Sequence, residues 1–232
     1  MSQTRPIPNP AWRRPPVLAR NPAQAMRQAV LDALLRGAAG PAGADGNAPR
    51  LLVAPAASAT APAQLAAAQS LDAAERQKLA ASHEQCLRVF RNLARGQAPD
   101  TEDDDLGAAL AFFTAVNLHA LHGVDVEREV MAVLERQLLG VSRRASNWDA
   151  ASLAQRQVFF ERIAILSIVV SSACASAPAQ GPAAVARLRQ AARQYLQELL
   201  GLNPDLLSLG PRGLVTRDGA APARTGAARR PS

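Results

Sequence analysis

The stretch LAQRQVFFERIAILSIVVSSACAS, residues 153–176, decides the fold class of this chain. Its most apolar part, residues 163–170, is rich in the β-branched residues Ile and Val, which would suit a buried strand. The residues before it have helical character, however, and no Gly or Pro separates the two parts. The sequence therefore predicts one long helix that lies buried at the centre of the domain.

Four other segments predict helices around this one. They are residues 70–96, 106–122, 125–139 and 183–201. The first has an apolar stripe of Leu79, Cys86, Val89, Phe90 and Leu93, and the second follows three aspartates that suit a helix N-terminus. Residues 64–210 contain no pair of alternating segments joined by a hairpin turn. We therefore expect an all-α fold, a compact bundle of about five helices.

Composition agrees with helices and places the positive charge outside the bundle. Hydrophobic residues make up 48% of the chain, and alanine, the best helix former, is the most frequent of them. The net charge of +7 divides into +5 for residues 1–63, −2 for residues 64–210 and +4 for residues 211–232. The predicted bundle is therefore slightly acidic between two basic flanks.

The flanks predict disorder because Pro, Gly and Ala leave them with few large side chains to bury. We expect a disordered Pro/Arg/Ala-rich flank over residues 1–63, a bundle over 64–210 and a disordered basic tail over 211–232. Residues 22–36 permit one short amphipathic helix in the first flank, with the stripe Ala25, Ala29, Leu31, Leu34 and Leu35. The arginines could neutralise phosphates, but Trp12 is the one aromatic residue among them, which argues against nucleic acid as the partner.

No membrane or export segment is predicted. The N-terminal residues form no apolar run typical of a signal peptide, and residues 163–170 are too few to cross a bilayer. We therefore expect no transmembrane segment and, by default, a cytoplasmic protein. Cys86 and Cys174 fit two small buried side chains, with a single bridge between helices as the alternative.

Two histidines one helical turn apart raise the question of a metal site. His119 and His122 could form half of a zinc or nickel site. A further ligand would come from His83, Glu127 or Glu161. Alternatively, both histidines occupy the last turn before Gly123, where they bind free carbonyl groups. His119, His122 and Glu161 are therefore candidate metal ligands if the protein binds a metal. We expect no cofactor.

Glu161 stands directly before the apolar run, which makes it a candidate for burial. Buried carboxylates are paired or have a shifted pKa, and both occur in active sites. The chain has no Ser-His-Asp, Cys-His or phosphate-binding pattern that would recruit Glu161 to catalysis. We therefore predict no catalytic residue.

The segments NLHALHGVDV (117–126) and QRQVFFERIAILS (155–167), with Gln137 between them, resemble a bacterial domain family of unknown function. The matching positions are Asn117, Ala120, Gly123, Gln157, Phe160, Glu161, Ala164 and Leu166, followed by Gly201, Pro204 and Gly213 near the C-terminus. The chain departs from the family pattern at Phe160, where tyrosine is usual, and at Ser167. The resemblance implies a small helical protein, often exported, and supplies no activity. It also implies that Asn117 and Glu161 both face into the bundle, so we hypothesise a buried polar contact between them.

These observations predict a non-catalytic domain that binds a protein or envelope partner. A metal-dependent enzyme or metal binder using His119 and His122 is one alternative. Nucleic-acid binding through the arginine-rich flanks is the other.

Overall fold

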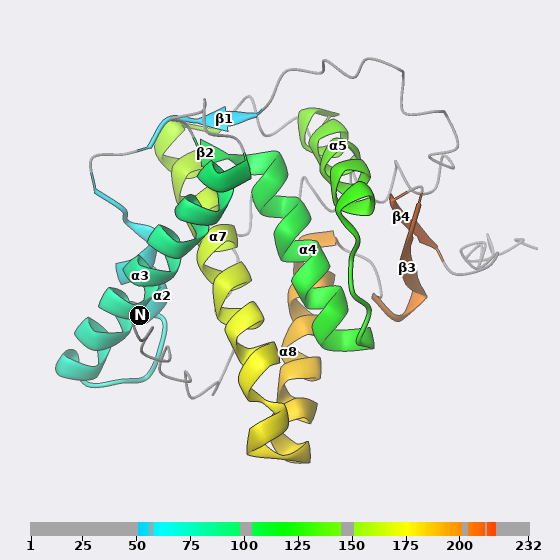
Figure 1. Ribbon diagram of the computed structural model, residues 1–232. Coiled ribbons are helices and arrows are strands. Elements are labelled where there is room, and N and C mark those ends of the chain that lie inside the picture. The colour runs from blue at the N-terminus through cyan, green and yellow to red at the C-terminus, as the bar shows by residue number, and fades with distance from the viewer. Residues whose placement is uncertain are drawn as a thin grey trace, which may run out of the picture.

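The computed structural model describes residues 51–55, 58–97, 104–144, 151–200, 204–211 and 213–216 (Figure 1). Its long helices are α3 (Ala73–Gln97), α4 (Leu106–His122), α5 (Arg128–Arg144), α7 (Leu153–Ser176) and α8 (Pro182–Leu200). They coincide with the five predicted segments, and the all-α prediction is confirmed. Residues 163–170 form the buried interior of α7, so the strand alternative is wrong.

Helix α4 lies in the middle of the bundle. It packs against α7 on one side and α5 on the other, and α8 also contacts it (Figure 1). Phe113 is buried on one face of α4, while Ala111 and Ala115 are buried on the opposite face. These alanines leave room for a neighbouring helix to approach closely. The helix begins where Asp105 accepts hydrogen bonds from Gly107 N–H (2.8 Å) and Ala108 N–H (3.3 Å).

Helix α7 is covered on its other side by α3, so the helices follow the order α3, α7, α4, α5 across the bundle (Figure 1). It starts with a capping box between Ser152 and Gln155. Among the described residues, α7 alone is long and apolar enough to cross a membrane by length and composition. The core helix of a water-soluble domain passes the same test, and most of this segment is buried inside the bundle.

Part of the predicted first flank, within residues 51–63, has regular structure. A two-residue strand, β1 (Leu52–Val53), pairs antiparallel with β2 (Asp104–Asp105), and the short helix α2 (Ala61–Ala67) follows it. Helix α2 packs against α3 and α7. The predicted disordered flank therefore extended too far into residues 51–63, and the permitted helix at 22–36 lies outside the described residues.

A hairpin near the C-terminus was not predicted. After the 3-10 turns η1 (Pro178–Gln180) and η2 (Pro204–Leu206), strand β3 (Leu207–Gly210) pairs antiparallel with β4 (Gly213–Thr216). Leu207 and Leu214 are buried, and β4 packs against α5. The prediction of a disordered tail from residue 211 is therefore wrong for residues 213–216, and residues 217–232 lie outside the described residues. Cys86 and Cys174 are both free thiols, so they form no bridge.

Candidate functional site

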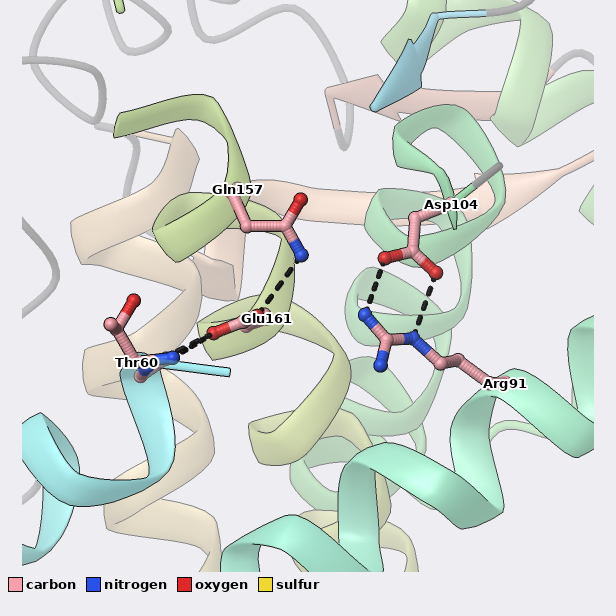
Figure 2. A network of polar contacts seen from close by, with 6 residues as sticks. Thr60, Arg91, Asp104, Gln157 and Glu161 are labelled. Atoms are coloured by element: carbon pink, nitrogen blue, oxygen red, sulfur yellow. Dashed lines mark hydrogen bonds and ion pairs between the residues drawn. The ribbon is translucent and has the colours of Figure 1, made fainter. Parts of the chain in front are cut away.

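Glu161 is a fully buried carboxylate that holds the start of α2. Its Oε2 accepts hydrogen bonds from Thr60 N–H (3.1 Å) and Ala61 N–H (2.9 Å), and its Oε1 accepts one from Gln157 Nε2 (3.0 Å) (Figure 2). Thr60 is the N-cap residue of α2, yet its own side chain makes no capping hydrogen bond. Glu161 therefore caps α2 from a position 100 residues further along the chain.

This arrangement explains why an acid is stable in an apolar core. Helix N-termini present unpaired N–H groups and partial positive charge, which favour a carboxylate. Gln157 lies one helical turn before Glu161 on α7 and supplies the third donor. These donors use both carboxylate oxygens, so Glu161 serves to join α2 to α7.

Asn117 is also fully buried, as the resemblance implied, but it does not meet Glu161. Its Nδ2 donates to the carbonyl oxygen of Phe113 on the same helix (2.8 Å), and its Oδ1 has no hydrogen-bond partner. The structure gives the two side chains separate partners. The direct contact that we hypothesised is therefore not among the hydrogen bonds of the described residues.

The two histidines at the end of α4 contact different residues. His119 Nδ1 lies 3.0 Å from Asp125 Oδ1 and 3.3 Å from the carbonyl oxygen of Val124. His122 Nε2 lies 3.4 Å from the carbonyl oxygen of Pro204. Within the described part of the chain, no group of three or more His, Cys, Asp or Glu side chains could hold a metal ion. The structure therefore does not bring the three candidate metal ligands together.

His83 has a structural position of its own. It is buried on α3, and its Nδ1 lies 3.3 Å from the carbonyl oxygen of Pro62 in α2. Burial lowers the pKa of His83, because the charged ring would lose its water, and the contact with Pro62 opposes this only in part. His83 thus joins α2 to α3, as Glu161 joins α2 to α7.

Arg91 and Asp104 form a bidentate ion pair that the sequence did not predict. Arg91 Nε donates to Asp104 Oδ1 (2.9 Å) and Nη2 donates to Oδ2 (2.7 Å) (Figure 2). Asp104 is only 6% exposed and lies in β2, which this pair fastens to α3. The aspartate run suggested a helix N-terminus, which is right for Asp105, but the sequence carries no signal for a partner thirteen residues earlier.

Gln137 clamps the C-terminal hairpin onto α5. Its Nε2 donates to the carbonyl oxygen of Leu214 (2.9 Å), and Leu214 N–H donates to its Oε1 (2.8 Å). The side-chain amide thereby satisfies both backbone groups of a strand residue. Gly213 has φ of +85°, and a Cβ there would stand 2.6 Å from Gln137 Oε1. Both positions belong to the resemblance, and the clamp gives each a structural role.

Three exposed leucines belong to elements at the end of the bundle where β1 lies. Leu52 in β1, Leu93 in α3 and Leu153 at the start of α7 are 42%, 51% and 74% exposed. Leu93 belongs to the predicted apolar stripe of α3, yet about half of its surface is exposed. We call these three residues the apolar end.

Three links place these residues at one end. Leu52 lies in β1, which pairs with β2, and Asp104 of β2 binds Arg91 near the end of α3, the helix that carries Leu93. Helix α7 contacts β1, and its first turn lies beside β1 (Figure 1). The last turns of α3, strand β1 and the start of α7 therefore lie at the same end of the bundle, which no single segment of the sequence reveals.

Comparison with known proteins gives a family and no activity. No curated protein and no solved structure matches the chain. One family model, described as a family of unknown function, matches residues 19–217. This range includes the bundle, both strand pairs and the segment 22–36. The chain therefore belongs to the family of unknown function DUF6683.

Proposed function

We propose that this domain is a non-catalytic binding module that holds a protein partner at its apolar end. The observation that carries the proposal is the exposure of Leu52, Leu93 and Leu153 at one end of the bundle. Single exposed leucines are ordinary, and we propose that these three, at one end of the bundle, act together as an interaction site. Burying one such side chain contributes about 1.5–3 kcal/mol.

The buried polar groups also support a binding role over a catalytic one. Glu161 caps α2, Asp104 pairs with Arg91, and Gln137 holds the hairpin. Each of these contacts fixes one element of the fold against another. A rigid bundle of this kind presents its surface with little loss of conformational entropy on binding.

The test is photocrosslinking in the cells that make the protein. Benzoylphenylalanine replaces Leu153 in the full chain, where 74% exposure leaves room for it. We expect an adduct with a second protein, and we expect Leu93→Asp to remove that adduct without lowering the thermal midpoint. The same probe at Arg189, which is exposed on α8, is the matched control.

Two results would overturn the proposal. One is the absence of an adduct at both Leu153 and Leu93. The other is an adduct of equal yield at Arg189, which would mean that the probe reports general surface collisions.

A further inference from the structure

We infer that the outer edge of β3 binds an extended peptide segment of a partner protein, which adds to the C-terminal hairpin as a third strand. The segment carries apolar residues with free N–H groups at alternate positions. The hairpin contains none of the residues of the apolar end, so this second surface stands or falls independently of the proposed function.

The hairpin has one closed edge, which lies along β4. Gly210 and Gly213 flank the turn and are paired, so they exchange hydrogen bonds across it. In antiparallel pairing the next pair, Leu209 with Leu214, makes none, and the N–H and C=O groups of both residues point away from the opposite strand. Gln137 binds both outward groups of Leu214, at 2.8 and 2.9 Å. The side chain of Gln137 therefore occupies the place of a further strand beside β4.

The other edge, along β3, is open. By the same alternation, the N–H and C=O groups of Leu209 and the C=O group of Leu207 point outward. The N–H of Leu207 completes the last i→i+3 turn of η2 and is already used. In the described part of the chain, no other residue forms a hydrogen bond with these three outward groups. Helix α5 packs against β4 (Figure 1), and a Cβ added at Gly210 would meet no atom within 4 Å.

Strand β3 lacks the features that normally protect a free edge. Proteins prevent unwanted pairing at strand edges with charged side chains, prolines or bulges. Residues 207–210 read LSLG, without charge or proline, and each of them pairs with one residue of β4, so there is no bulge. An edge of this kind suits the addition of a strand, which is a common mode of peptide recognition.

The outward groups of β3 define the segment that fits. A segment antiparallel to β3 donates one N–H to Leu209 C=O, accepts from Leu209 N–H, and donates a second N–H, two residues further on, to Leu207 C=O. The side chains at these two positions lie on the same face as Leu207 and Leu209, which pack against the core. The residue between them lies beside the partly exposed Ser208. A segment with two apolar residues separated by any one residue meets these requirements, provided that neither apolar position is proline.

A second copy of β3 fits this edge less well. If Leu209 pairs with Leu209 of the second copy, Pro211 lies opposite Leu207 and has no N–H to donate. If Leu209 pairs instead with Leu207 of the second copy, the N–H that it needs is the one used by η2. Either register forms two of the three hydrogen bonds. A free segment of another protein forms all three and is therefore the better occupant.

Titration of the isotope-labelled full chain with a synthetic peptide, followed by nuclear magnetic resonance, tests the inference. The probe is acetyl-Lys-Val-Thr-Val-Lys-amide, in which the valines supply the apolar positions and the charged lysines oppose self-assembly. We expect the amide signal of Leu209 to shift with a Kd of the order of 1 mM, because three hydrogen bonds and two small side chains contribute. Hydrogen exchange of this amide should slow about tenfold at saturation.

Two modified peptides and one variant of the chain are the matched controls. N-methylation of both valines removes the N–H groups that β3 accepts and should weaken binding about tenfold or more. N-methylation of the threonine, whose N–H faces away from β3, should leave the affinity unchanged. Leu209→Pro removes the outward N–H of the edge and none that β4 uses, so it should abolish the shift. The amide signal of Leu214 then shows whether the hairpin is still held by Gln137.

Four results would overturn the inference. The first is no shift of the Leu209 signal at about 10 mM peptide, which is well above the expected Kd. The second is equal binding of the peptide with methylated valines, and the third is loss of binding when only the threonine is methylated. The fourth is slow exchange of the Leu209 amide in the free chain. Such protection would mean that the edge is already covered, by a second copy if it rises with chain concentration and by the chain itself if it does not.

Discussion

Replacing Glu161 with alanine should destabilise the whole domain, because its carboxylate, on α7, caps the start of α2. The substitution leaves Ala61 N–H and Gln157 Nε2 without their acceptor in the core. Thr60 N–H also loses its acceptor, but Thr60 is exposed and water can replace it. Two donors therefore determine the cost.

A buried donor left without an acceptor costs about 1–3 kcal/mol, so the two together cost roughly 2–6 kcal/mol. This is a large part of the total stability of about 5–15 kcal/mol that is usual for a domain. Glu161→Gln should cost less, roughly 1–2 kcal/mol, because hydrogen bonds to a charged acceptor are about twice as strong as neutral ones. The amide of Gln157 can turn over to meet the new side chain, since its Oε1 has no partner in the core.

Urea unfolding of the full chain measures these costs through the midpoint at constant slope. Amide hydrogen exchange over residues 61–67 shows whether α2 opens locally before the rest. Glu75→Ala is the matched control, because Glu75 makes a similar capping contact with Asp72 N–H at the exposed start of α3. A Glu161→Ala variant whose midpoint falls no further than that of the control would refute the reasoning.

Three further predictions concern other parts of the fold. Gly213→Ala should destabilise the hairpin by about 1–3 kcal/mol, because φ is +85° and the added Cβ meets the clamping amide, whereas Gly210→Ala, with open space around it, should shift the urea midpoint far less. Burial lowers the pKa of His83 below its ordinary 6.5, so the unfolded chain takes up the proton first. Stability from this residue should therefore be full above pH 6.5 and fall as the pH drops below it, and a pH series of unfolding midpoints for His83→Gln should lack that part of the decline. Burial raises the pKa of Cys86 to about 11 and also raises that of the partly exposed Cys174, so an aromatic disulfide reagent should modify Cys174 first and Cys86 only on unfolding; equal rates in the native protein would contradict this.

The long helices could be predicted because each carries its own pattern of apolar residues. Residues 163–170 show how far such reasoning reaches. Their β-branched side chains suggest a strand, but the absence of a Gly or Pro before them keeps them in α7. The double-sided burial of α4 likewise follows from alanines on one face and larger apolar residues on the other.

The elements that were missed depend on distant partners. Helix α2 is seven residues long and rich in Ala, and its cap comes from Glu161, so its own sequence predicts very little. Strands β1 and β2 have two residues each and are fixed by Arg91 in α3. Pattern reasoning can indicate that a polar residue such as Asn117 is buried, but its hydrogen-bond partner depends on how whole helices pack.

The same physics explains why the surface that we propose for binding could not be predicted from the sequence. The histidine pair His119 and His122 attracted attention because the two are close in sequence. The apolar end consists of Leu52, Leu93 and Leu153, which lie far apart in the chain and come to the same end of the bundle only after folding.

The capping of α2 by Glu161 has a consequence for the order in which the newly made chain becomes fixed. Ala61 is synthesised 100 residues before its cap, and ribosomes add about 5–20 residues per second, so roughly 5–20 s separate the two. During that interval α2 can pack on α3, but its first N–H groups have no carboxylate to bind. Helix α2 is thus synthesised early, but its N-terminal cap forms only when α7 has left the ribosome.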